Sequence, residues 1–559
     1  MTLLPAWSAA FGLQIVLLVL SVSSQQVPLS DNPTHSDSTS YGNNHVTIAD
    51  AAFEQYIRDK MARWHVPGLA IAVLDGNKTW TKGYGYASLD HEPVTPSTLF
   101  YCGSMTKSFT AAALSLLVDQ SQDYADIQWS TPVSSLLRDD FVLSDDWATG
   151  HVTIADVLSH RTGYPRHDYA GPFLNSSETM VRSFRHLPMA GEPREKWRYS
   201  NLMYGTMGYL VESLTNSSLA DFFRDRLWHP MGMYNTYLHP DDALASGNTL
   251  AVPYYWDNDT ETQGEIPWRD ERNIAGAGMA ISSILDWSRY LRHMIQETGP
   301  ISKAGHHTLK LPHIVVEEGD RLFTGPIYYG FGWFGSVFQD EPVWWHSGLV
   351  NSMMSIMMMV PSKNFGFVIM INSETMPALD SILAKTLYDF FGVQEDKRQD
   401  LEASWNQTYR EYEERVGNCS NRLYPSLPSP LLPAPLPLKY FVGNYSHPGY
   451  GPITISLRCE EWDAPIDSPA SPSTTKDGCR LVAVKIDDFG KHVSYQLEHK
   501  SGDYWVGWLF DDDLASVKRP KDCYRVQFRV DEAGRSRWFG IDIRMEGEDV
   551  PLVWFERQK

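Results

Sequence analysis

The chain has 559 residues, of which 43% are hydrophobic and 21% are charged, an ordinary composition for a globular protein long enough for two or three domains. Its formal net charge of −21 argues against nucleic acid and anionic membranes as partners, because both require lysine and arginine to neutralise phosphate. A small neutral or cationic substrate stays compatible with this charge.

Residues 1–24 are predicted to be a secretory signal peptide, so we expect a secreted, extracellular protein. An apolar run from Leu13 to Val22 precedes a cleavage site near Ser24. The residues before the run include no lysine or arginine, so an uncleaved anchor is the alternative. No later run reaches the roughly 18 apolar residues of a membrane span, and no stable insertion is expected. Residues 25–45 are polar and are predicted to be a disordered leader.

Sequons and cysteines also indicate export. The seven N-x-S/T sequons are Asn77, Asn175, Asn216, Asn258, Asn406, Asn418 and Asn444. Cys419, Cys459, Cys479 and Cys523 lie toward the C-terminus and predict two disulfides in an oxidising compartment, with three possible pairings. Cys102 stands apart from them and is expected to be a packed, half-buried thiol.

Residues 46–393 are predicted to form one α+β domain. A helix from Val46 to about Trp64 precedes a β-hairpin with an Asp75-Gly76 turn, and mostly helical patterns follow to about Trp287. Strand patterns return at 328–334, 343–350, 352–360 and 365–372, before a helix over 377–392. Because strands at both ends bracket a helical middle, we predict an antiparallel sheet flanked by helices, with a helical insertion beside it.

The remaining sequence is predicted to be a linker and a second domain. Residues 394–437 read as a charged helix followed by a proline-rich spacer. Residues 438–559 contain short, aromatic-rich, alternating strands, which predict a small all-β barrel or sandwich.

Ser104 and Lys107 form an S-x-x-K motif at the start of an apolar helical pattern. Residues three apart share one helix face, and burial disfavours the charged form of a lysine, so this amine could accept the serine proton. The motif is short, and it recurs at Ser473 to Lys476 in a loop-like stretch. Without further motifs, an N-capping serine beside a surface lysine would explain the pattern equally well.

Two further motifs follow in a fixed order. Tyr199-Ser200-Asn201 precedes an amphipathic helix, and His346-Ser347-Gly348 lies on an apolar strand. With S-x-x-K they resemble the motifs of the serine β-lactamase and DD-peptidase superfamily, especially its class C and esterase branch. Longer matches are "TIADVLSHRTGYP", "AGAGMAISSILDWSRYL", "YGFGW" and "GFVIMINS". The resemblance covers roughly residues 47–393 and implies a β-lactamase/transpeptidase-like fold. The C-terminal segment is similar to the lipocalin-like barrel of some members.

The resemblance also implies roles for individual residues. Ser104 would be the acylated nucleophile, Lys107 its partner, and Tyr199 a phenolate or hydrogen-bonded base. Asn201 would hold a substrate carbonyl or the Lys107 ammonium.

The third motif would line the substrate site. His346, Ser347, Gly348 and Leu349 are its residues, and the backbone amides of Ser104 and Leu349 would form the oxyanion hole. His346 replaces the lysine of β-lactamases. An imidazole is neutral over much of the relevant pH range, so we expect a small ester, lactone, amide or D-residue peptide substrate rather than a β-lactam.

Two alternatives remain open: acyl transfer to another alcohol or amine, and a non-catalytic binding or sensor protein with the same fold. No metal-ligand spacing and no cofactor motif supports a prosthetic group, because Gly330, Gly332 and Gly335 lack the helix of a dinucleotide site. We therefore expect neither cofactor nor metal, and the sequence leaves the oligomeric state open. Lys500-Ser501-Gly502 also imitates the third motif, within the predicted β domain.

Overall fold

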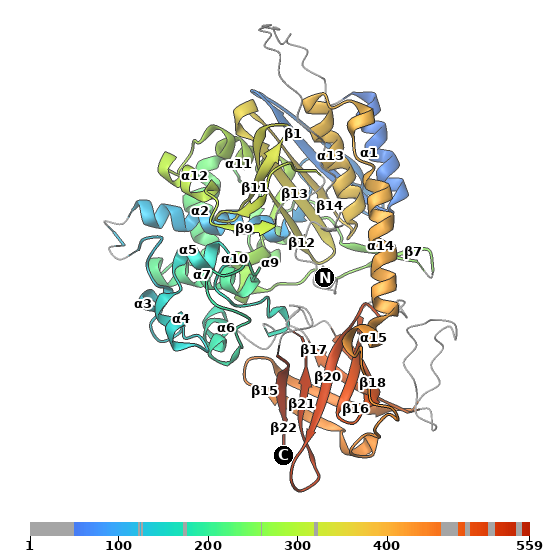
Figure 1. Cartoon of the computed structure of the whole chain (residues 1–559). Helices are drawn as coiled ribbons and strands as arrows, with labels where there is room; N and C mark the ends of the chain where they lie inside the picture. The colour runs from blue at the N-terminus through green and yellow to red at the C-terminus, as the bar shows by residue number, and fades with distance from the viewer. Residues whose placement is uncertain are drawn as a thin grey trace, which may run out of the picture.

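A computed structural model of the chain shows a large mixed unit above a β-barrel (Figure 1). It describes residues 50–120, 123–124, 127–170, 176–258, 260–317, 322–459, 479–486, 492–511, 520–543 and 551–559. The predicted signal peptide and leader lie outside these residues, as do the second S-x-x-K copy and the sequon at Asn175.

A nine-stranded antiparallel sheet forms the centre of the mixed unit, in the order β3-β2-β1-β14-β13-β12-β11-β10-β9. Its strands are β1 (Gly68–Asp75), β2 (Lys78–Ser88), β3 (Glu92–Pro93), β9 (Ile314–Glu317), β10 (Ile327–Tyr329), β11 (Phe334–Phe338), β12 (Glu341–Val350), β13 (Met353–Val360) and β14 (Phe365–Ile371). The predicted hairpin is confirmed, because Asp75 pairs with Lys78 across the turn between β1 and β2. The predicted strand at 328–334 is two strands, β10 and β11, separated by residues 330–333.

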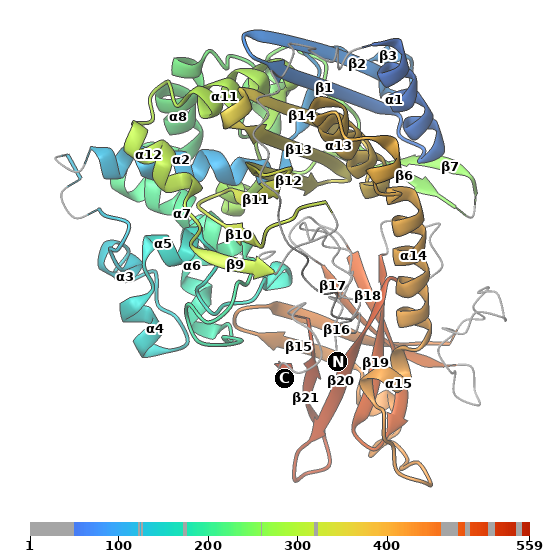
Figure 2. The ribbon, with the colours of Figure 1, turned by 45° about the horizontal axis from the view of Figure 1, so that its top comes forward.

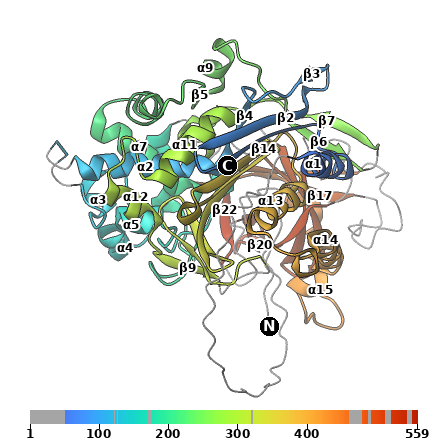
Figure 3. The same cartoon turned by 90° about the horizontal axis from the view of Figure 1, so that it is seen from above.

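Helices cover both faces of this sheet. Leu69 and Ile71 of β1 pack in a core with α1 (Ala51–Arg63) and α13 (Met376–Phe391). The alternate residues Ala70 and Ala72 pack in a second core with α2 (Thr106–Asp119) and α11 (Ile284–Gln296). Figure 3 shows the two pairs of helices on opposite sides of β14. Burial on both faces explains why β13 and β14 are almost entirely apolar, Ser355 of β13 being the polar exception.

The middle of the chain forms a mostly helical insertion beside the sheet. Its helices are α3 (Val133–Leu136), α4 (Asp146–His151), α5 (Ile154–Leu158), α6 (Ser177–Ser183), α7 (Asn201–Thr215), α8 (Leu219–Phe223), α9 (Pro240–Ala245), α10 (Ala275–Gly278) and α12 (Lys303–Lys310). A small sheet of β4 (Leu99–Tyr101), β8 (Ile281–Ser283) and β5 (Thr236–Tyr237) accompanies them, with the hairpin β6 (Tyr254–Asp257) and β7 (Thr262–Glu265).

Helix α14 (Leu401–Gly417) runs from the mixed unit alongside the barrel and is followed by α15 (Cys419–Leu423) (Figure 2). The barrel is closed and has eight antiparallel strands in sequential order. They are β15 (Gly443–His447), β16 (Gly451–Arg458), β17 (Arg480–Ile486), β18 (His492–Ser501), β19 (Tyr504–Asp511), β20 (Asp522–Val530), β21 (Ser536–Ile541) and β22 (Val553–Arg557). The predicted α+β fold class with a C-terminal β-barrel is confirmed.

The four C-terminal cysteines form two disulfides, Cys419–Cys523 and Cys459–Cys479, which resolves the pairing that the sequence left open. Cys102 is fully buried rather than half-buried, and its sulfur accepts a hydrogen bond from the Trp287 indole at 3.0 Å. Among the helices that the structure describes, none is both long enough and apolar enough to cross a bilayer.

Candidate active site

Ser104 and Lys107 lie where β4 turns into α2. A short 3-10 helix, Gly103–Met105, carries the serine, and α2 continues from it with Lys107 in its first turn. Gly103 has a φ of +52°, and a Cβ there would lie 2.4 Å from the Leu349 amide nitrogen, so glycine is required for this approach. The Lys107 Nζ lies 3.0 Å from the Ser104 Oγ, within hydrogen-bonding distance. The structure therefore brings the two residues of the motif together.

Tyr199 completes the contact around the serine. It lies in the extended segment just before α7, and its hydroxyl donates to the Ser104 Oγ at 2.7 Å. The Lys107 Nζ lies 4.7 Å from the centre of its ring. A hydroxyl, an amine and a phenol from two distant segments thus meet within hydrogen-bonding distance.

Lys107 is buried among neutral acceptors. Its Nζ also donates to the Asn201 Oδ1 at 2.8 Å and to the Ala277 carbonyl at 2.7 Å. Burial lowers the pKa of Lys107 well below its usual range, the positive charge of Arg166 lowers it further, and Asp168 acts in the opposite direction. Burial therefore favours the neutral amine, whose two N–H groups donate to Asn201 and Ala277 and whose lone pair is left to accept the Ser104 proton.

Tyr199 responds to burial in the opposite sense. Burial raises the pKa of this phenol, although the hydrogen bond to Ser104 and the charge of Arg166 lower it in part. The uncharged phenol is therefore favoured, which makes Tyr199 a hydrogen-bond donor to the serine. Of the two forms that the sequence left open, this geometry favours the hydrogen-bonded phenol over the phenolate.

A short charged segment supports these groups and was not recognised from the sequence. Asp168 accepts a hydrogen bond from the Asn201 amide at 3.1 Å and pairs with Arg166 at 2.7 Å. The Arg166 guanidinium lies 5.1 Å from the centre of the Tyr199 ring. Asn201 therefore holds the Lys107 amine on one side and Asp168 on the other.

His346 lies on β12 and is buried. Its Nδ1 hydrogen-bonds the Ser347 carbonyl oxygen at 2.7 Å, so Nδ1 carries the proton, and Nε2 accepts from the Tyr329 hydroxyl at 2.9 Å. Burial, aided by Lys107 when that amine is protonated, lowers the pKa of His346 to about 3. The imidazole is therefore neutral near neutral pH, as expected from the sequence.

The rest of the third motif packs its backbone against the nucleophile. A Cβ at Gly348 would lie 2.0 Å from the Cys102 carbonyl oxygen, so only glycine permits this approach. The contact with Gly103 places the Leu349 amide beside the segment that carries Ser104. The Ser347 hydroxyl is buried and has no hydrogen-bond partner among the described residues.

His160, in the stretch "TIADVLSHRTGYP", contacts the site directly. Its ring lies 4.3 Å from the ring of Tyr199, and its Nδ1 accepts from the Ser200 amide at 3.1 Å. Burial lowers the pKa of His160 well below its usual range, with Lys107 the next cause, so the ring is neutral. His160 thus fixes the backbone that presents Tyr199.

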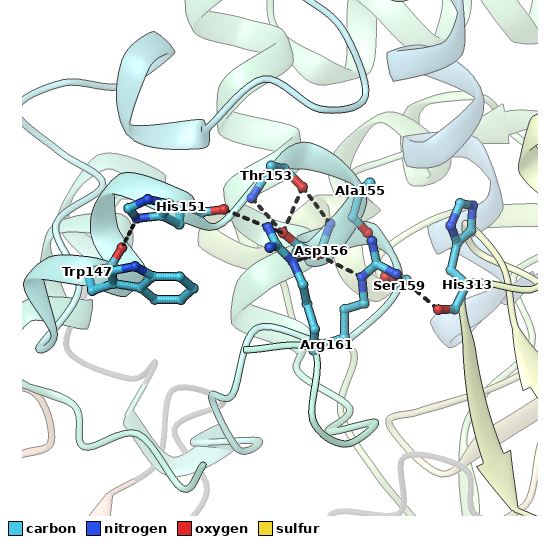
Figure 4. Close-up of polar contacts among 9 residues, drawn as sticks. Trp147, His151, Thr153, Ala155, Asp156, Ser159, Arg161 and His313 are labelled. Atoms are coloured by element: carbon cyan, nitrogen blue, oxygen red, sulfur yellow. Dashed lines mark hydrogen bonds and ion pairs between the residues drawn. The ribbon is translucent and has the colours of Figure 1, made fainter. Parts of the chain in front are cut away.

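The loop that carries His160 is anchored by a buried carboxylate. Asp156 of α5 accepts hydrogen bonds from Arg161 at 2.7 Å and Arg194 at 2.7 Å, and from the Thr153 hydroxyl at 2.8 Å. Figure 4 shows Arg161 reaching from Asp156 toward the His313 carbonyl, a bond of 3.0 Å. This cluster ties α5 to the start of β9.

The Lys500-Ser501-Gly502 copy of the third motif lies away from this site. Lys500 pairs with Glu498, and Ser501 accepts from the Leu432 amide, so this imitation of the third motif belongs to the barrel. Among the described residues, no three His, Cys, Asp or Glu side chains gather as metal ligands.

Comparison with known proteins places this site in a family context. The profile of the Beta-lactamase family matches residues 53–387, which are more than half of the chain. An unguisins hydrolase of Aspergillus campestris (strain IBT 28561) is 39% identical over 416 residues, 73% of this chain and 77% of the relative. An unguisins hydrolase of Aspergillus violaceofuscus (strain CBS 115571) is 31% identical over 540 residues, 92% of this chain and 91% of the relative.

Among solved structures, the octameric penicillin-binding protein homologue from Pyrococcus abyssi superposes with a TM-score of 0.56 at 20% identity. The match covers 88% of this chain and 97% of that one, so the likeness of fold extends over the mixed unit and the barrel.

Proposed function

The chain belongs to the beta-lactamase family, and from this premise we propose that it is a serine hydrolase whose Ser104 forms a covalent acyl-enzyme with an ester, lactone, amide or peptide substrate. The observation that carries the proposal is the contact of the Ser104 Oγ with the Lys107 amine at 3.0 Å and the Tyr199 phenol at 2.7 Å.

Acylation follows from these contacts. The neutral Lys107 amine takes the Ser104 proton while the Oγ attacks the substrate carbonyl carbon. The carbonyl π electrons move onto oxygen, and the amides of Ser104 and Leu349 stabilise that oxyanion. When the intermediate collapses, Tyr199 gives its proton to the leaving oxygen or nitrogen and regains one from the Lys107 ammonium.

Deacylation reverses these proton transfers with water as the nucleophile. The amine, again neutral after the leaving group has departed, takes a proton from water through Tyr199, and the hydroxide attacks the acyl carbonyl. The Ser104 oxygen leaves with the proton. An alcohol or amine in place of water would give acyl transfer.

For the substrate class, we propose a compound related to the unguisins. The support is the naming of both fungal relatives as unguisins hydrolases, one of them aligned over nine tenths of this chain. The neutral His346 is consistent with a substrate that has no carboxylate at that position, since an imidazole without charge offers no ion pair.

A fluorophosphonate probe tests the covalent mechanism, and mass spectrometry of unguisin incubations tests the substrate. We expect a probe adduct on Ser104 that is absent from Ser104→Ala, and an unguisin product heavier than the substrate by one water or split in two. A folded wild-type protein without an adduct would contradict the serine mechanism and favour a binding protein. An adduct on Ser104 without unguisin turnover would contradict the proposed substrate and leave the serine mechanism supported.

We also propose that the protein is secreted and glycosylated. Five sequon asparagines in the described residues are exposed, which leaves them accessible to a glycosyltransferase: Asn77, Asn216, Asn258, Asn418 and Asn444. Enzymatic removal of N-glycans from the secreted protein should lower its apparent mass. No change in mass, together with retention in the cell, would contradict this.

A further inference from the structure

The turn between β15 and β16 of the barrel touches the segment that supports the catalytic residues. Tyr450 lies in this turn and is fully buried, and its hydroxyl hydrogen-bonds the Nδ1 of His167. Gly449 packs against Leu187 of the insertion, where an added Cβ would lie 2.6 Å from a leucine methyl carbon. The barrel therefore reaches the mixed unit directly as well as through the linker.

The hydrogen bonds of His167 show which group donates and which accepts in its contact with Tyr450. The Nε2 of His167 faces the Pro188 carbonyl oxygen at 2.9 Å, so Nε2 carries the proton. The Nδ1 is then the acceptor, and the Tyr450 hydroxyl donates to it. A phenylalanine at 450 would fill the same space and offer no donor.

His167 lies between the two charged residues of the site. Arg166 covers the Tyr199 ring, and Asp168 holds Asn201, which in turn holds the Lys107 amine. His167 has a φ of +49°, a left-handed conformation that a non-glycine residue adopts only when surrounding contacts hold it. Both ring nitrogens of His167 supply such contacts.

The barrel itself holds this turn. The Lys485 Nζ on β17 is buried and donates to the Tyr450 carbonyl oxygen at 2.7 Å. The Gly449 amide donates to the His447 Nδ1 at 3.0 Å. These two hydrogen bonds hold the turn from within the barrel, in addition to its contact with His167.

We propose that one turn of the barrel positions the catalytic residues: Tyr450 is a positioning residue that, through His167, keeps Arg166 against Tyr199 and Asp168 against Asn201. This inference rests on the proposed function, because it assigns a task in the acylation of Ser104. It predicts that losing one hydroxyl in the barrel slows chemistry in the mixed unit.

The test measures fluorophosphonate labelling of Ser104 in the full-length protein, which requires no natural substrate. For Tyr450→Phe we expect the maximal labelling rate to fall about tenfold, because small displacements of aligned groups cost that much. The half-saturating probe concentration should stay unchanged. A matched control is Tyr445→Phe, a buried barrel tyrosine whose hydroxyl bonds the Phe441 carbonyl and Ser536, both at 2.9 Å.

Equal labelling rates for Tyr450→Phe and Tyr445→Phe would overturn the proposal. Absence of labelling in the wild type would instead contradict the proposed function, so the two failures are distinguishable.

A second variant tests the same contact from the other side, in case Tyr450→Phe does not fold. His167→Asn keeps a residue that tolerates the left-handed backbone and should show the same loss of maximal rate. If both residues act through their contact, the double variant should be no slower than His167→Asn alone. Additive losses would contradict the proposal.

Discussion

Two buried ionisable side chains, Lys107 and Asp156, lie in neighbouring parts of the mixed unit and have opposite surroundings. Both are fully buried, and both have a lowered pKa. For the carboxyl of Asp156, burial alone would raise the pKa, and hydrogen bonds from Arg194 and Thr153 with the charge of Arg161 more than offset it. For the amine of Lys107, burial itself is the main cause.

The same direction of shift therefore has opposite meanings. A lowered pKa keeps a carboxylate charged and locked to its two guanidiniums, whereas it leaves a lysine neutral and able to accept a proton. The difference lies in the partners. Asp156 has two cations, while the acceptors of Lys107 are the neutral oxygens of Ser104, Asn201 and Ala277. The carboxylate of Asp156, paired with two cations, stabilises the fold, whereas the amine of Lys107, whose hydrogen-bond acceptors are all neutral, is left able to react.

The largest expected effect comes from removing the amine. Lys107→Met should lower the rate of substrate turnover by at least about 10⁴-fold, because the only base touching Ser104 among the described residues is lost. The free energy of unfolding of this variant should stay within about 1 kcal/mol of wild type, since no longer burying the amine offsets the three lost hydrogen bonds. Calorimetry and turnover assays check both. A strongly destabilised variant would show that Lys107 is a structural residue.

The converse change should destabilise the fold and spare the chemistry. Asp156→Asn removes the charge that pairs with two arginines, and we expect a loss of about 2 kcal/mol in unfolding free energy. This is modest because the Arg161 and Arg194 side chains keep 22% and 46% exposure. Denaturant unfolding measures it, and activity per folded molecule should change little. A wild-type midpoint would mean that the carboxylate contributes no net stability.

Acid should separate the two residues in a single titration. Turnover requires neutral Lys107, so activity should fall as the pH drops through its folded pKa, which lies well below 10.5. Asp156 stabilises the fold above its unfolded pKa, and this contribution is lost only as the pH falls through the folded value, which lies below 3.8.

Because two different groups titrate, we expect the loss of activity, measured by turnover, and the unfolding, measured by circular dichroism, to be separate transitions. In Asp156→Asn the unfolding transition should move and the acidic limb of activity should not. Coincident transitions in the wild type would contradict this assignment.

The smallest effect is expected from His160, which lies between Tyr199 of the catalytic site and the cluster around Asp156. Its ring contacts Tyr199, and the next residue, Arg161, binds Asp156. Because His160 has a φ of +58°, His160→Asn should keep the backbone and lower the turnover number about tenfold, with little change in KM. An unchanged turnover number would leave His160 with no part in presenting Tyr199.

The sequence was sufficient to predict elements whose pattern is local. The β-hairpin at Asp75, the apolar strands and the closing helix are confirmed, because alternation and turn residues specify them. The split between β10 and β11 was missed, since the aromatic run from Tyr328 to Phe334 continues across the break. Disulfide pairing required coordinates because spacing alone does not discriminate among three connectivities.

For the site, motif order was enough to single out Ser104, Lys107 and Tyr199. The support from Arg166 and Asp168 was missed because a contact between segments some thirty residues apart leaves no spacing pattern. The state of the Tyr199 phenol was open for a similar reason, since its burial arises only from tertiary packing. The tyrosine of "YGFGW", Tyr329, lay in a recognised motif, and its role as donor to His346 needed the structure.

The Cys419–Cys523 bond has a consequence for proteolysis. It joins α15 to β20 and so spans the whole proline-rich segment on the way to the barrel. A protease that cut this segment once would leave both halves covalently joined. The clipped protein would migrate as one band on a non-reducing gel and as two after reduction, and the barrel would stay tethered in an oxidising medium.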